Sequence, residues 1–218
     1  MHSLLLFSGE TINYPILIGF VLSSSALAIS PGPDNIFVLT QSISNGVRAG
    51  LATVLGLVSG CLVHTTLLAF GVSEIIKRSD ALFFGIKLFG AIYLFYLAYK
   101  VFKSDGDILL EDKKAAKSPK NLFWRGFTMN VLNPKVTIFF LAFFPGFLFS
   151  TELDPVVQFY VLGLLFMLSA LIIFGAIALL AGSISNYLKG HNKVGFYLKW
   201  VQIIVFSGIA VYLLLSDK

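Results

Sequence analysis

Residues 25–41, SALAISPGPDNIFVLTQ, interrupt a long apolar run with two prolines, after which a second apolar segment begins. Pro31 and Pro33 have no backbone N–H and restrict the residue before each of them, so a helix that enters this stretch must end near Ser30. Pro33 then suits the first position of a new helix. The sequence therefore predicts a helix that stops at Ser30 and starts again at Pro33.

The composition places this break in a membrane. Hydrophobic residues make up 57% of the 218 residues and charged residues only 12%, against roughly 25% charged in soluble chains. The apolar residues are grouped into runs of membrane length, which predicts a single all-α polytopic membrane domain, residues 1–218. The six predicted transmembrane helices are 12–29, 49–72, 81–102, 127–149, 156–182 and 194–215.

One long polar segment, residues 103–121, divides the chain into two halves of three spans each, 1–102 and 122–218. We interpret this segment as a flexible cytoplasmic linker. Because three is an odd number, the second half begins on the opposite side of the membrane from the first. The prediction is therefore a 3+3 inverted repeat, the arrangement found in many secondary transporters.

Lysine and arginine residues set the expected orientation. Twelve lie on the side that holds the linker and four on the side that holds both termini, which predicts that the linker is cytoplasmic and both termini are outside. We interpret the basic residues behind the net charge of +5 as topology signals and contacts to anionic lipid headgroups. No basic stripe interleaved with aromatic residues occurs, so no nucleic-acid partner is predicted. Lys87 and Lys100 are expected to extend toward the membrane surface.

Residues 34–72 are too long for one span, since 39 helical residues would extend about 58 Å through a hydrocarbon layer of about 30 Å. Gly46 and Arg48 mark the expected break. Residues 34–44 are thus predicted to form a short helix, either re-entrant or along the cytoplasmic interface.

The second half has its own proline break in NVLNPK, residues 130–135, where Asn133 is the expected N-cap and Pro134 the first helical residue. Pro145-Gly146 should break the far end of the same span. Such breaks indicate a transporter binding site, because a helix N-terminus attracts a carboxylate and freed carbonyls can hold a cation. The alternative is that both breaks are ordinary capped helix ends.

His64 lies in the middle of a span, on the helix face that carries Ala52, Gly56 and Gly60. Small residues let a second helix approach closely, so His64 is expected inside the bundle. It either makes an interhelical hydrogen bond or carries a proton, because its ordinary pKa is about 6.5. With three histidines and one cysteine, Cys61, the chain has no metal-spaced cluster, and neither a metal nor another cofactor is predicted.

Taken together, SPGPDN, GVRAGLATVLGLVSGCLVH, GAIYLFYLAYKVFKS and FTMNVLNPKVTIFFLAFFPGF resemble the LysE/RhtB family of bacterial amino-acid exporters over nearly the whole chain. The resemblance implies a secondary transporter that exports an amino acid or a close derivative across the inner membrane, driven by the proton gradient. Many members of that family have glutamine where Gly146 stands, so any polar contact from that side chain is missing here.

The leading hypothesis places the site between the two halves. Asp34 would hold an ammonium group or a coupling proton, and Lys135 with the helix N-termini would hold a carboxylate. The alternative is an intramembrane enzyme or membrane-assembly protein that uses Asp34 and His64 without moving solute. The sequence leaves open the exported amino acid and whether the chain forms a homo-oligomer. The candidate site residues are Pro31, Gly32, Pro33, Asp34, Asn35, His64, Asn130, Asn133, Pro134 and Lys135.

Overall fold

A computed structural model describes residues 12–30, 32–73, 80–104, 118–190 and 194–215, and within these ranges every regular element is helical. The first half contains α1 (Tyr14–Ile29), α2 (Pro33–Asn45), α3 (Val47–Leu67) with a π-helical turn η1 (Leu68–Val72), and α5 (Asp80–Lys103). The second half contains α6 (Pro119–Val131), α7 (Pro134–Phe143) with a 3₁₀ turn η2 (Phe144–Phe147), α8 (Pro155–Leu179), α9 (Ala181–Gly190) and α10 (Val194–Leu215).

Four helices are long and apolar enough to cross a membrane: α3 with η1, α5, α8 and α10. Two further pairs qualify if each bent pair counts as one span. They are α1 with α2, bent by 57°, and α6 with α7 and its 3₁₀ turn, bent by 53°. The described part of the chain therefore offers four to six spans, and the protein is a multi-pass membrane protein.

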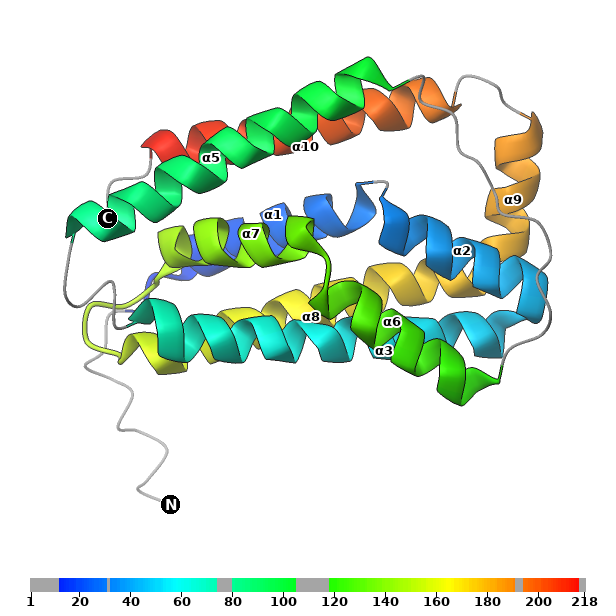
Figure 1. The fold of residues 1–218 in the computed structure, drawn as a ribbon, viewed down its shortest axis with the longest axis horizontal. Helices are drawn as coiled ribbons and strands as arrows, with labels where there is room; N and C mark the ends of the chain where they lie inside the picture. The colour runs from blue at the N-terminus through cyan, green and yellow to red at the C-terminus, as the bar shows by residue number, and fades with distance from the viewer. Residues whose placement is uncertain (1–11, 31, 74–79, 105–117, 191–193, 216–218) are drawn as a thin grey trace.

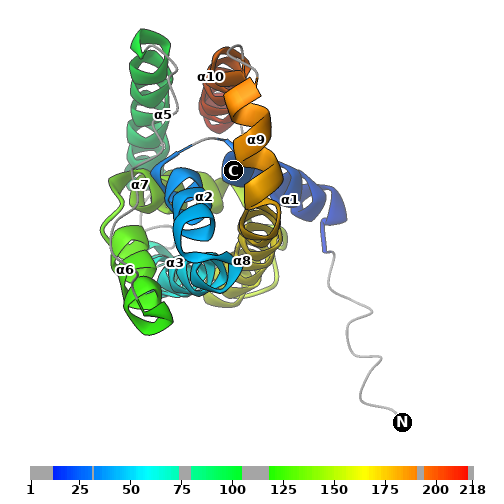
Figure 2. The ribbon, with the colours of Figure 1, turned by 90° about the vertical axis from the view of Figure 1, so that its right-hand side faces the viewer.

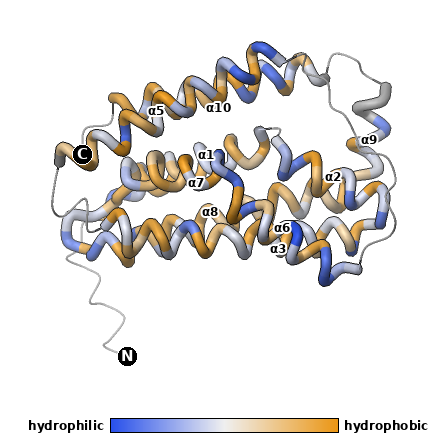
Figure 3. The backbone as a smooth tube through the Cα atoms, viewed as in Figure 1, coloured by the Kyte–Doolittle hydropathy of each residue, from blue (hydrophilic) through white to orange (hydrophobic). Residues whose placement is uncertain are grey.

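The helices form three layers (Figures 1 and 2). α5 and α10 lie side by side in one outer layer, and α3, α6 and α8 lie in the opposite one. Between them, α1, α2 and α7 form the central layer, so both helix breaks lie in the middle of the molecule. Figure 3 shows apolar residues along almost the full length of the long helices, as expected for helices surrounded by lipid and by one another.

The local sequence explains where these helices begin. α2, α6, α7 and α8 each begin with proline, which has no N–H to leave unpaired and a backbone angle that suits a first turn. Ser118, Asn133 and Asp154 cap the last three of these helices with side-chain oxygens. Gly46, at φ 85°, separates α2 from α3 as predicted. The end of α1 at Ile29 also agrees with the predicted stop near Ser30.

Glycines bring α3 and α6 into direct backbone contact. A Cβ at Gly56 would lie 2.8 Å from the carbonyl carbon of Phe123 and 2.9 Å from the nitrogen of Phe127. At Gly60 it would lie 2.7 Å from Asn130 Oδ1, and at Gly126 it would collide with the Thr53 carbonyl. The prediction that a small-residue face next to His64 admits another helix is confirmed, and that helix is α6.

Phenylalanines of α7 fill the centre of the bundle. Phe139 stacks on Phe143 and Phe140 on Phe144, with ring centres 4.4 Å and 4.1 Å apart. Phe20 of α1 packs edge-on against Phe144, with ring centres 5.0 Å apart. These aromatic contacts connect the broken helix of one half to the broken helix of the other.

Several boundaries differ from those predicted. α6 begins at Pro119, before the predicted span start at residue 127, because Ser118 and Pro119 supply a cap and a first helical residue inside the polar segment. α8 ends at Leu179, and α9 is a separate helix that the sequence did not predict. Most of the predicted linker, residues 105–117, lies outside the described residues.

The expectation for Lys87 was wrong. This side chain is only 8% exposed, so it lies within the protein and does not extend to the membrane surface. Its ammonium group lies 5.7 Å from the centre of the Phe83 ring, one helical turn away on α5. A cation over an aromatic face is stabilised without reaching water, and this contact helps to hold Lys87 inside the protein.

Candidate functional site

The two helix breaks, far apart in the sequence, meet in the structure. Asp34 and Lys135 are each the second residue of a helix that begins with proline, α2 and α7. Asn133 Nδ2 donates a 3.5 Å hydrogen bond to Asp34 Oδ2, and the charges of Asp34 and Lys135 interact. A Cβ at Gly32 would lie 3.3 Å from Lys135 Nζ, so the lysine of one break lies against the backbone of the other.

Two more helices complete this site. Lys135 Nζ lies 4.8 Å from the centre of the Phe206 ring on α10. Cys61 of α3 is 2% exposed and close enough to Asp34 for an electrostatic interaction. The carboxylate and the ammonium group are therefore enclosed by helices from both halves of the chain.

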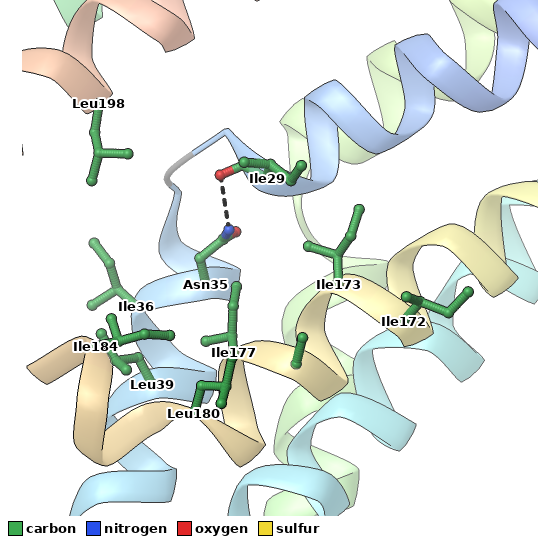
Figure 4. A pocket seen from close by; sticks show the side chains of 11 residues that line it. Ile29, Asn35, Ile36, Leu39, Ile172, Ile173, Ile177, Leu180, Ile184 and Leu198 are labelled. Atoms are coloured by element: carbon green, nitrogen blue, oxygen red, sulfur yellow. Dashed lines mark hydrogen bonds between the residues drawn. The ribbon is translucent and has the colours of Figure 1, made fainter.

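Side chains donate hydrogen bonds to carbonyl groups beside each break, and at the second break the Asn133 N–H donates to the same carbonyl as His64. At the first break, Asn35 Nδ2 donates to the carbonyl oxygens of Ala28 and Ile29, at 2.9 and 3.4 Å, and Figure 4 shows the second of these bonds. At the second break, His64 Nε2 lies 3.1 Å from the carbonyl oxygen of Asn130 and donates to it in the matching tautomer. His64, 4% exposed, thus makes the interhelical hydrogen bond that was one of its two predicted roles.

Two side-chain oxygens at the site accept no hydrogen bond within the described part of the chain. Asp34 Oδ1 and Asn130 Oδ1 are fully buried, and neither accepts a hydrogen bond from the described residues. Leaving a buried acceptor unpaired costs about 1–3 kcal/mol, and more when it is charged. The site therefore favours a group that carries several donors, such as an ammonium group.

The structure brings most of the predicted site residues to one place. Gly32 to Asn35 form the first break, Asn130 to Lys135 form the second, and His64 joins the second break through Asn130. Pro31 lies outside the described residues. Sequence analysis missed Phe206 and Cys61 as neighbours of the charged pair, because neither is near a proline in the chain. No group of three potential metal-binding side chains occurs in the described ranges.

These features define a class of protein: a polytopic helical membrane protein with two proline-broken helices that meet at a half-buried pair of opposite charges. The LysE type translocator family matches residues 25–217, and the chain belongs to this family. Membership in a family of translocators does not favour the enzyme alternative.

Two of the similar proteins are efflux proteins. The chain is 31% identical to the homoserine/homoserine lactone efflux protein of Salmonella typhimurium, over 80% of this chain and 84% of that protein. It is 27% identical to the leucine efflux protein of Klebsiella pneumoniae, over 89% and 92% of the two chains. An uncharacterized membrane protein of Bacillus subtilis is 33% identical over 61% of this chain and 67% of its own length. No solved structure matches the chain significantly.

Proposed function

We propose that this protein is a secondary transporter that exports an amino acid or a close derivative across the bacterial inner membrane, coupled to the proton gradient. The observation that supports it most is the half-buried pair of Asp34 and Lys135 at two adjoining helix N-termini, where Asp34 Oδ1 accepts no hydrogen bond from the described residues. An ionisable residue inside a membrane protein is costly and usually serves function. A zwitterionic amino acid carries the two charges that complement this pair.

In this mechanism Asp34 binds the ammonium group of the solute or a coupling proton. The carboxylate of the solute binds Lys135 and the backbone N–H groups at the starts of α2 and α7, where the helix dipoles favour negative charge. Solute binding and the Asp34–Lys135 contact then compete for the same groups. Such competition lets the two breaks separate when solute is bound and come together when it has left.

The inverted repeat is part of this proposal. Each half starts with a bent pair, α1 with α2 and α6 with α7, and each second helix begins with proline followed by a charged residue. The two charges have opposite signs, which is why the breaks attract each other where the halves meet. In the inverted arrangement, rocking of one half against the other would open the site to alternate sides.

Export is tested in two ways. Purified protein in proteoliposomes should move labelled amino acids without altering them, and an imposed pH gradient should drive their accumulation. Overproduction should let bacteria resist a growth-inhibiting excess of the same amino acid or its dipeptide. An enzyme would instead convert the compound, a membrane-assembly protein would do neither, and a channel would ignore the pH gradient.

The orientation gives a separate prediction. Reporters fused to the C-terminus and inserted at Thr151 should respond as outside the cell, while a reporter within residues 105–117 should respond as cytoplasmic, because basic residues favour the cytoplasmic side. Fusions of alkaline phosphatase and green fluorescent protein measure this directly. A cytoplasmic C-terminus would show that the number of spans is not six and would contradict the inverted repeat.

A further inference from the structure

Phe206 lies at the charged site, and the proposed transport mechanism gives it no role. The centre of its ring is 4.8 Å from Lys135 Nζ, and its side chain is only 1% exposed. Among the described residues of α10, the rest of the buried face is aliphatic, with Ile209, Ala210 and Leu213. The aromatic ring of this face thus lies next to the ammonium group of the second helix break.

The geometry is that of a cation–π contact. A cation within about 6 Å of an aromatic ring centre is attracted by the negative charge of the ring face, and the attraction grows when both groups are withdrawn from water. The ring of Phe206 is enclosed by its neighbours, so their packing fixes its position. A Cβ at Gly32 would lie 3.3 Å from the same Lys135 Nζ. The ammonium group thus contacts α10 as well as the backbone of the first break.

Lys135 has two partners at the site that differ in kind. The carboxylate of Asp34 neutralises its charge, whereas the ring of Phe206 attracts the ammonium group and leaves its charge uncompensated. In the proposed mechanism the ammonium group of the solute competes for Asp34, so Asp34 loses its hold on Lys135 as the solute binds. The ring of Phe206 is still in contact at that moment. It keeps the Lys135 ammonium group at the break, where the group is free to bind a carboxylate.

We propose that Phe206 is a positioning residue for solute binding: its ring holds the Lys135 ammonium group in place for the solute carboxylate while the solute ammonium group occupies Asp34. The inference rests on the proposed export function and adds a residue of α10 to the recognition of the carboxylate. Phe206 acts through Lys135 and does not itself bind the solute. The competing explanation is that Phe206 only fills space in the bundle, as the stacked phenylalanines of α7 do.

Fluorinated phenylalanines at position 206 separate these two roles. Each added fluorine withdraws electrons from the ring face and weakens its attraction for a cation, while the shape of the ring changes little. Mono-, di- and trifluorophenylalanine form a graded series, and Phe206→Leu removes the ring. Phe159→Leu is the matched control, because Phe159 of α8 is 0% exposed and no cation of the described residues lies over its ring. The fluorinated series keeps the test valid if Phe206→Leu fails to insert.

The measurement is proteoliposome uptake of whichever amino acid the unmodified protein moves fastest among labelled leucine, serine, lysine and methionine. The half-saturating concentration should rise with each fluorine, and Phe206→Leu should raise it by about 3- to 30-fold, equivalent to about 0.7–2 kcal/mol. The maximal rate should change by less than about two-fold, because the contact is lost equally from the bound solute and from the state that moves it. Phe159→Leu should leave the half-saturating concentration unchanged.

Two results would overturn this inference and leave the export function intact. The first is a half-saturating concentration that stays the same across the fluorinated series. The second is an equal response of the amino acid and of its amide, used as a competitor, because the amide has no carboxylate for Lys135 and the ring would then be in contact with the solute ammonium group. Uptake of no amino acid at all by the unmodified protein would instead refute the proposed function.

Discussion

Asp34→Asn should abolish gradient-driven export while the protein still folds and inserts. Asparagine keeps the size and the capacity for hydrogen bonds of aspartate but removes the charge that would hold an ammonium group or a proton. Neutralising one member of a buried charge pair typically costs about 2–5 kcal/mol, and because Asp34 and Lys135 are half-buried we expect the lower end of this range, a loss of roughly 30-fold. Amino-acid flux in proteoliposomes at matched protein level, with and without a pH gradient, measures this loss of export.

The competing explanation is that Asp34 only stabilises the start of α2, which a carboxylate does by about 0.3–1 kcal/mol. Asp154→Asn is the control for that effect, because Asp154 caps the start of α8 and is not one of the site residues. It should change flux by a few-fold at most. Near-normal flux of Asp34→Asn with an intact pH dependence would remove Asp34 from the mechanism.

A double variant separates the loss of function from the loss of a partner. Asp34→Asn alone leaves the Lys135 ammonium group without its opposite charge, and that could disturb the site indirectly. Adding Lys135→Gln removes the second charge as well, so no unpaired ammonium group remains at the site. The double variant should be at least as stable as Asp34→Asn and equally inactive. Recovered transport would show that each charge serves only to compensate the other and that neither is needed for transport.

The breaks themselves were predictable because their causes are covalent. A proline lacks its N–H wherever it stands, so the ends near Ser30 and the starts at Pro33 and Pro134 follow from the sequence alone. Gly46 and the cap at Asn133 are local signals of the same kind. The helix face of small residues on α3 could also be predicted, because Ala52, Gly56 and Gly60 recur at every fourth position.

The meeting of Asp34 with Lys135 was proposed on functional grounds but not determined by any local pattern. It depends on which helices pack together, and that is decided by contacts between distant parts of the chain such as those of Gly56 with α6. The same holds for Phe206 beneath Lys135 and for the burial of Lys87. α9 has no proline or glycine signal between it and α8, so a continuous apolar run concealed the boundary.

The contact between α3 and α6 has the second large expected effect, because it positions both His64 and Asn130. The three atoms nearest to a Cβ at Gly56 would all be backbone atoms of α6, which cannot rotate away as the end of a side chain can. Gly56→Ala should therefore force the two helices apart and destabilise the protein by about 1–3 kcal/mol, with Gly56→Val worse. Thermal unfolding of detergent-purified protein, followed by size-exclusion chromatography, reports the loss.

Gly175→Ala is the matched control, since Gly175 lies within α8 where an added Cβ meets no atom within 4 Å. Alanine there should be neutral or stabilising by about 0.5–1 kcal/mol, because glycine is the more costly residue inside a helix. If Gly56→Ala unfolds at the same temperature as Gly175→Ala, the close contact of α3 with α6 is refuted. Loss of this helix contact would also disturb the site, because the hydrogen bond from His64 to the Asn130 carbonyl joins α3 to α6. Separation of the helices should accordingly reduce transport as well as stability, whereas a purely peripheral packing defect would reduce stability alone.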